Sequence, residues 1–84
     1  MGKASTTKRL LSIHEVARSF KISKATANYY TNLGLLRIAD KQGNKRLYDL
    51  QETERTLGKI KSLRTQGYTL KLIQRTFLHN DRAR

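Results

Sequence analysis

The stretch from Ser23 to Tyr48 constrains the fold of this chain more than any other. It begins with KATANYYTNLGLL, which predicts one short helix that ends at a glycine. It continues with RIADKQGNKRLY, which predicts two basic strands around a glycine-centred turn. A helix followed by a basic hairpin can place the helix in one groove of a duplex and the hairpin against the neighbouring backbone. The flanking segments must then supply the core on which both rest.

Size and charge limit the function that such a core can support. A chain of 84 residues forms one small domain, with room for one binding task. Lys and Arg number 18 against 6 Asp and Glu, which gives a formal charge of +12 and an isoelectric point near 10.6. This excess favours a polyanionic partner, with nucleic acid first and an acidic membrane surface second. The alternative is a folded domain whose charge only aids solubility.

The composition excludes a protein built on disulfides or thiolate metal sites, and a protein that spans a membrane with an apolar helix. The sequence contains no Cys, so neither a disulfide nor a thiolate metal site can form, and a reducing interior such as the cytosol fits. No run of about 18 apolar residues is present that could span a membrane. We therefore expect a cytoplasmic, nucleoid-associated protein.

The residues before the central stretch predict a supporting helix. Apolar residues recur at helical spacing in this segment: Ile13, Val16, Ala17 and Phe20. Ser12 and Glu15 have the spacing of a capping box, and Ser23 can cap a second helix from Lys24 to about Leu33, with Gly34 as its left-handed exit. Two helices joined by so few residues are a helix-turn-helix candidate. Residues 1–9 are expected to form a flexible basic tail.

The second predicted helix has an outer face without apolar bulk. Its inner side takes Ala27, Tyr30 and Leu33, which leaves a polar set outside: Lys24, Ala25, Asn28, Tyr29 and Asn32. Small residues let a helix approach base edges, and Asn can make a bidentate pair with adenine. A solvated polar face is the alternative. Of the two adjacent tyrosines, we expect one to pack and the other to contact DNA.

The hairpin is expected to form a basic wing. Arg37, Ile38 and Ala39 lead into the turn-rich cluster DKQGN, and Lys45 to Tyr48 run back, with Gly43 relieving a strained backbone angle. A plain surface hairpin is the alternative, since basic side chains often protect exposed edges.

Two further helices are predicted after the hairpin. Asp49 caps the first, with Glu52 as a second capping box, and a buried stripe runs to Gly67: Leu50, Thr53, Leu57, Ile60 and Leu63. Among the cations on its outer side, Arg64 is the one that we expect to contact DNA. Thr69 caps the last helix, in which Leu70, Ile73 and Phe77 face inward, whereas Leu72 and Leu78 do not fit the stripe. The domain is expected to span residues 10–79, with a frayed end at 80–84.

The order SIHEVARSF, SKATANYYTNLGLL, GNKRLYD and IKSLRTQGYTLKLI resembles the DNA-binding domain of the MerR family of bacterial transcription regulators. The resemblance covers roughly residues 11–77. It implies a winged helix-turn-helix, mainly α with about four helices and a small β-hairpin wing, in which the second helix enters the major groove. The hairpin would be the first wing, and the last two helices would form a second.

The resemblance implies DNA contacts at Arg18, Tyr29, Tyr30, Arg46 and Arg64. It also implies that Asn28 stands where relatives commonly carry arginine, so the DNA preference is expected to be this chain's own. Relatives continue into a long helix that forms a dimer, so a homodimer is expected only through a segment absent from this chain. Together with exposure and charge, these expectations give the full set of candidate DNA contacts: Arg18, Lys21, Lys24, Ala25, Asn28, Tyr29, Tyr30, Arg37, Lys45, Arg46 and Arg64.

Other functions find little support in the sequence. His14 and His79 lie far apart, and no set of nucleophile, base and carboxylate accompanies them, so we expect neither an enzyme nor a metal site. No cofactor and no ligand pocket of useful size are expected. Two alternatives to a transcription regulator remain: an excisionase-like or chromosome-organising DNA protein, and, less favoured, an RNA-binding protein.

Overall fold

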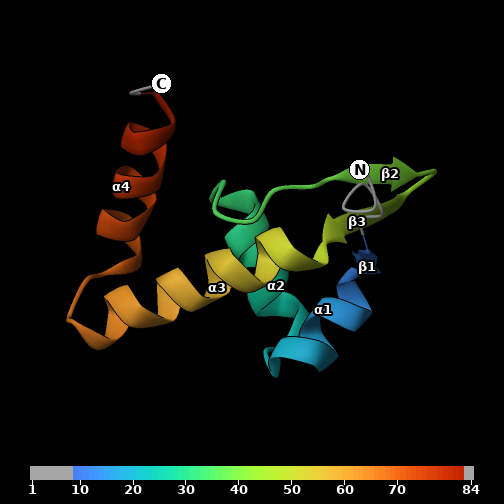
Figure 1. Cartoon of the computed structure of the whole chain (residues 1–84), viewed down its shortest axis with the longest axis horizontal. Helices are drawn as coiled ribbons and strands as arrows, with labels where there is room; N and C mark the ends of the chain where they lie inside the picture. The colour runs from blue at the N-terminus through green and yellow to red at the C-terminus, as the bar shows by residue number, and fades with distance from the viewer. Residues whose placement is uncertain (1–8, 83–84) are drawn as a thin grey trace, which may run out of the picture.

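The computed structural model describes the backbone of residues 9–82 and the side chains of residues 9–78. The tail expected at residues 1–8 and the end at residues 83 and 84 lie outside this described part. Seven elements follow one another along the chain (Figure 1): β1 (Leu10–Ser12), α1 (Ile13–Phe20), α2 (Lys24–Asn32), β2 (Asp40–Gln42), β3 (Lys45–Asp49), α3 (Leu50–Thr65) and α4 (Leu70–Arg82). The predicted class, four helices with a small β wing, is confirmed.

The strands form one antiparallel sheet in the order β1-β3-β2. Leu11 pairs with Tyr48 on one side of β3, and Lys41 pairs with Arg46 on the other. The expected two-stranded hairpin therefore needs correction in two respects. A third strand from the start of the domain joins it, and its outgoing strand is Asp40–Gln42 rather than the segment that begins at Arg37.

Side-chain caps fix the starts of the helices. The Ser12 hydroxyl accepts from the Glu15 N–H (3.2 Å) while Glu15 accepts from the Ser12 N–H (2.8 Å), so the predicted capping box is confirmed. Ser23 caps α2 by accepting from the Thr26 N–H at 2.9 Å. Between α1 and α2, Lys21 adopts a left-handed conformation with φ of 57°, which is unfavourable for a residue with a Cβ.

Asp49 is both the last residue of β3 and the N-cap of α3, so no linker separates the wing from this helix. Its carboxylate accepts from the Glu52 N–H at 2.8 Å. Glu52 does not return the bond, so the second capping box is only half formed. Gly67, with φ of +100°, then turns the chain into α4, whose first turn is capped by Thr69.

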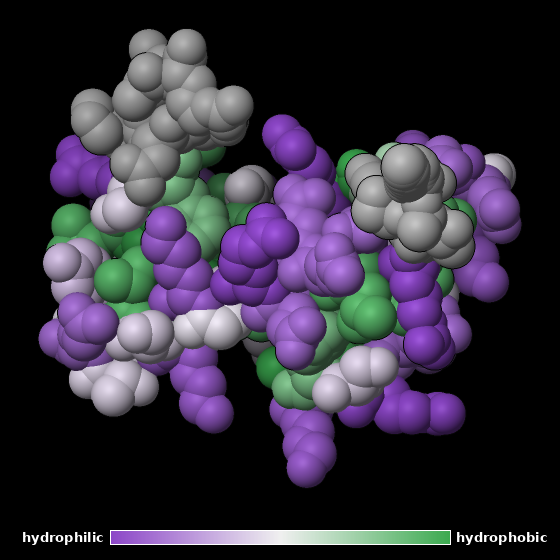
Figure 2. All heavy atoms as spheres, viewed as in Figure 1, coloured by the Kyte–Doolittle hydropathy of each residue, from purple (hydrophilic) through white to green (hydrophobic). Residues whose placement is uncertain are grey.

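The core gathers residues from every helix and from two strands. Its buried members are Leu11, Val16, Ala27, Tyr30, Leu35, Leu36, Tyr48, Ile60 and Ile73. The space-filling view shows such apolar residues only as patches between the hydrophilic side chains that cover this face (Figure 2). The predicted inward stripes of α3 and α4 are confirmed, and Leu72 and Leu78 are exposed, as expected.

Two side-chain hydrogen bonds tie distant elements to the helix-turn-helix. The Tyr48 hydroxyl of β3 lies 3.0 Å from the Thr31 hydroxyl of α2. The Gln74 amide of α4 donates to the Leu33 carbonyl at the end of α2, at 2.8 Å. The wing and the last helix are thus both fixed against the second helix, which crosses behind α3 in Figure 1.

Candidate nucleic-acid interface

The outer face of α2 is polar and accessible, as the sequence predicts. Lys24, Ala25 and Asn28 are exposed, while Ala27 on the inner side is fully buried. The core therefore holds the helix by one face and leaves its N-terminal half free on the other. Small and hydrogen-bonding side chains in such a position can approach base edges in a major groove.

The adjacent tyrosines of α2 have different surroundings. Tyr29 is 51% exposed, whereas Tyr30 is 8% exposed and belongs to the core. Their ring centroids are 6.4 Å apart. Successive residues of a helix point about 100° apart, so Tyr29 faces outward while the ring of Tyr30 packs inward. A DNA contact by either tyrosine stays a prediction. The prediction that one of the two tyrosines packs is confirmed for Tyr30, and Tyr29 is exposed.

The wing carries a pair of like charges on one of its faces. Lys41 and Arg46 are direct cross-strand partners in β2 and β3, and both are exposed. Directly opposed side chains lie on the same face of a sheet, so the two cations repel each other there. Residues two apart on a strand share a face, which places this pair on the side of β3 that carries Tyr48. That side contacts α2 through Thr31.

Lys45 lies on the other face of β3, toward α1. The pKa of Glu15 is lowered, mainly because its carboxylate accepts the hydrogen bond from the Ser12 N–H, and to a smaller extent by the charges of Lys45 and Arg9. Neighbouring cations of the wing thus have different environments. Lys45 contributes to the field at the start of α1, whereas Arg46 shares the α2 side of the ribbon with Lys41.

The hydroxyl contact between α2 and the wing has a defined direction. The Thr31 hydroxyl donates its single proton to the Ala27 carbonyl at 2.8 Å. The Tyr48 hydroxyl must therefore be the donor in the 3.0 Å contact with Thr31. Since the Tyr48 side chain is fully buried, this bond fixes the base of the wing relative to α2.

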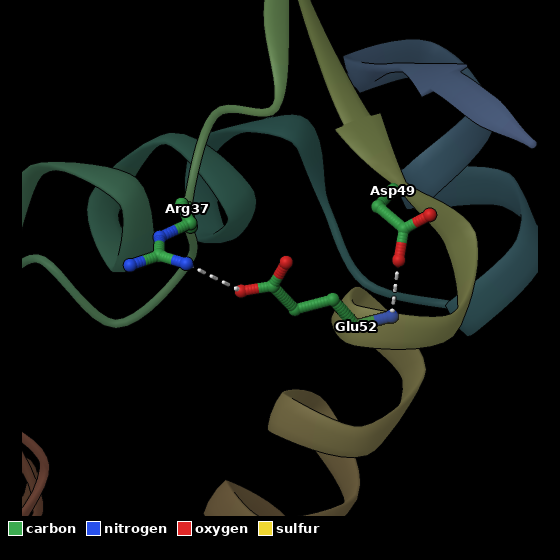
Figure 3. A network of polar contacts seen from close by, with 3 residues as sticks. All are labelled: Arg37, Asp49 and Glu52. Atoms are coloured by element: carbon green, nitrogen blue, oxygen red, sulfur yellow. Dashed lines mark hydrogen bonds and ion pairs between the residues drawn. The ribbon is translucent and has the colours of Figure 1, made fainter. Parts of the chain in front are cut away.

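Arg37 does not belong to the wing, contrary to the prediction. It lies in the irregular segment between α2 and β2, and its guanidinium is 3.7 Å from the Glu52 carboxylate of α3 (Figure 3). The same glutamate receives the α3 cap through its backbone N–H. Arg37 is 70% exposed at its side chain, so it remains accessible to a ligand while it pairs with Glu52.

Arg18, Lys21 and Arg64 are exposed on three different segments. The structure brings Lys21 and Arg64 together, because both line a groove of about 760 Å³ between the α1–α2 connection and α3. The sequence gives no indication of this open groove. Arg18 occupies the last turn of α1, where a cation also favours the helix dipole.

Sequence reasoning missed two cations near the predicted contacts. Lys41 is not among the predicted contacts, yet it lies opposite Arg46 as a direct consequence of the two-residue turn at residues 43 and 44. Lys61 lines the groove with Arg64, a relation that only the packing of α3 against the helix-turn-helix reveals.

Within the described residues, no three or more His, Asp or Glu side chains gather as a metal site would require. His14 is exposed near the start of α1, and the side chain of His79 lies outside the described part. None of the helices in residues 9–82 combines the length and apolar character needed to cross a membrane.

Comparison with known proteins places this architecture in a family. Residues 11–79 match the family model described as MerR HTH family regulatory protein. No curated protein sequence matches the chain significantly. Among solved structures, a transcriptional regulator of the MerR family from Bacillus cereus is similar, with a TM-score of 0.70 and 28% sequence identity. The match covers 83% of this chain and 52% of that protein, so the chain spans about half the length of its structural relative. Since the family match covers most of the sequence, the chain belongs to the MerR helix-turn-helix family.

Proposed function

We propose that this chain binds double-stranded DNA sequence-specifically, as the DNA-binding domain of a MerR-like transcription regulator. In this proposal the outer face of α2 enters the major groove, the β2–β3 wing contacts phosphates beside it, and α3 with α4 forms a second wing that contributes Arg64. The match to the MerR family and the similarity to a MerR-family transcriptional regulator both support this function.

One observation carries the proposal most directly. The wing holds Lys41 and Arg46 opposite each other, on the side that contacts α2 through Tyr48. Like charges in this arrangement destabilise a free hairpin. A phosphate backbone placed beside α2 would supply the missing negative charge, which turns a repulsive pair into a binding site.

The proposed mechanism separates affinity from sequence preference. Cations such as Arg18 and Arg46 neutralise phosphates and fix the register of the protein on the duplex. Lys24, Ala25, Asn28 and Tyr29 sample base edges from α2. If about five or six phosphates are neutralised, the logarithm of the binding constant falls with the logarithm of salt concentration with a slope of roughly −5.

The first test measures fluorescence anisotropy of two labelled duplexes across a salt series. One duplex is a site enriched from a random library by repeated selection on the protein, and the other is a scrambled sequence of the same composition. We expect the steep salt slope on both duplexes and tighter binding to the selected one. A slope near zero, or stronger binding to an RNA duplex in competition, would refute the proposal.

A matched pair of wing variants tests the geometry. Arg46→Ala and Lys45→Ala remove the same charge from neighbouring positions on opposite faces of β3. We expect Arg46→Ala to weaken binding to both duplexes alike and to lower the magnitude of the salt slope by about one. Lys45→Ala should have the smaller effect. Equal effects would show that only the net charge of the wing matters.

Asn28→Ala tests base recognition. If the Asn28 amide contacts a base, its loss should cost about 1–3 kcal/mol on the selected duplex and little on the scrambled one. Equal losses on the two duplexes would instead make Asn28 a residue that only positions the helix.

A further inference from the structure

The groove between the helix-turn-helix and α3 has an apolar floor. Phe20 and Ile22 come from the α1–α2 connection and its flank, Tyr30 comes from α2, and Leu57 and Ile60 come from α3. All five are buried or half-buried, so the floor is part of the domain core and is already formed. A preformed concave site of about 760 Å³ lies in the size range of small-molecule sites, which is roughly 300–1,000 Å³.

A glycine in the middle of α3 keeps this groove open. Gly58 lines the groove, and its φ is not positive, so the backbone does not require glycine there. A Cβ built on it would meet no atom within 4 Å, so neighbouring packing does not require glycine either. Glycine nevertheless destabilises a helix interior relative to alanine. Because Gly58 lines the groove, a larger side chain at this position would narrow it.

The charges on the groove lining are unbalanced. Lys21, Lys61 and Arg64 are exposed there, against the single carboxylate of Glu54. Apolar walls with a few cations at the opening suit a ligand that is apolar along its body and anionic at one end. Because the residues that line the groove come from separate segments, no local sequence motif indicates it.

We propose that this groove binds a small organic anion with an apolar body, of the aliphatic or aromatic carboxylate class. We further propose that the bound anion competes with DNA, because Lys21 and Arg64 belong both to the groove and to the set of candidate phosphate contacts. The competition rests on the function proposed above, whereas anion binding itself does not. Ligand and duplex would then control each other through two shared cations.

The binding test uses the full chain without DNA. Dodecanoate and dodecyltrimethylammonium, which share the same dodecyl chain and differ in head-group charge, are each titrated below their micelle concentrations into ¹⁵N-labelled protein. We expect dodecanoate to shift the amide signals of Ile22 and Gly58 saturably with a submillimolar dissociation constant, and to leave Leu72 on the exposed side of α4 unchanged. Dodecyltrimethylammonium should bind several-fold more weakly.

Three variants assign the site. Gly58→Leu fills the groove from a position with free space and should abolish dodecanoate binding while it preserves the fold, since leucine favours a helix more than glycine does. Lys61→Gln should weaken dodecanoate several-fold. Lys71→Gln removes the same charge from α4, outside the groove, and should have no effect.

Competition is then measured by adding dodecanoate to the anisotropy assay. The dissociation constant of the duplex should rise for the wild type and stay constant for Gly58→Leu, which should bind DNA as the wild type does. Equal binding of both amphiphiles, shifts centred on Leu72, or undiminished binding to Gly58→Leu would overturn the site. Anion binding at Ile22 and Gly58 with unaltered DNA affinity would overturn the competition. A chain that bound dodecanoate but no duplex would refute the proposed function and leave the groove site standing.

Discussion

The hydrogen bond from Tyr48 to Thr31 gives the most direct test of how the wing is fixed to α2. Tyr48→Phe removes only the hydroxyl from a fully buried ring, so no large cavity is left. A typical intramolecular hydrogen bond contributes about 0.5–1.5 kcal/mol net. Thr31 is half-buried and keeps its bond to the Ala27 carbonyl, so water can partly replace the lost donor. We expect a loss of about 1 kcal/mol in the free energy of unfolding.

Urea and thermal unfolding followed by circular dichroism measure this loss. For a domain of this size, about 1 kcal/mol corresponds to a fall of roughly 4–8 °C in the melting temperature. Tyr68→Phe is the matched control, because Tyr68 is 41% exposed, and it should change stability by less than about 0.5 kcal/mol. A double-mutant cycle with Thr31→Val should show a coupling of about 0.5–1 kcal/mol.

The same variant separates stability from recognition. At a temperature well below the melting point, Tyr48→Phe keeps every cation, so its salt slope with DNA should equal that of the wild type. Its affinity should fall modestly, because the wing is less firmly oriented against α2. Unaltered stability, or additive effects of Tyr48→Phe and Thr31→Val, would refute the idea that this bond fixes the wing.

Three further perturbations test other parts of the structure. Lys21→Gly should raise stability by up to about 1 kcal/mol in urea unfolding, because glycine adopts the left-handed conformation at this position freely, and a destabilised variant would contradict this reasoning. Because the pKa of Glu15 is lowered in the fold, its ionised carboxylate stabilises the fold at pH values above the ordinary glutamate pKa of 4.5, and this contribution disappears as the pH falls through the lowered pKa. Urea unfolding of the wild type and Glu15→Gln from pH 7 to pH 2 should therefore show a stability difference that shrinks toward acid. A difference that stays constant with pH would contradict this reasoning. Arg37→Ala should change the free energy of unfolding by no more than about 0.5 kcal/mol, because the ion pair with Glu52 is solvent-exposed, and a loss above about 1 kcal/mol would show that the pair is structural.

The sequence was sufficient to predict the helices because their signals are local. Ser12, Ser23 and Asp49 each lie directly before an amphipathic segment, and each caps a helix in the structure. The inner and outer faces of α2 followed from the helical period alone. These features depend on residues within one or two turns of each other, so no tertiary information was needed.

The sheet and the ends of the wing could not be predicted in this way. β1 has only three residues, and its partner β3 lies on the other side of the helix-turn-helix. So short a segment carries no period, and only pairing with a distant strand makes it extended. Arg37 was misplaced for a related reason, since a basic residue before a turn-rich cluster has the composition of a strand while its backbone is irregular.

The sequence pattern was sufficient to predict which residues of α2 are exposed. Lys24, Ala25 and Asn28 lie on the accessible face that the pattern indicates. The family motif presents two tyrosines together, whereas the helix separates their directions and buries most of Tyr30. The groove was missed altogether, because its lining comes from three segments whose contacts arise only when α3 packs against α1 and α2.

The direct passage from strand to helix at Asp49 has a consequence for how chains of this kind can change in length. An extra residue at this junction would turn α3 by about 100° about its axis and carry its apolar stripe out of the core. A residue added within β3 between Arg46 and Tyr48 would exchange the two faces of the strand and carry Arg46 away from the side that it now shares with Tyr48. The turn at Gly43 and Asn44 has no such constraint, so the wing can lengthen or shorten at its tip. Insertions and deletions should therefore collect at the tip, where they alter how far the wing reaches along a duplex without disturbing the domain that holds it.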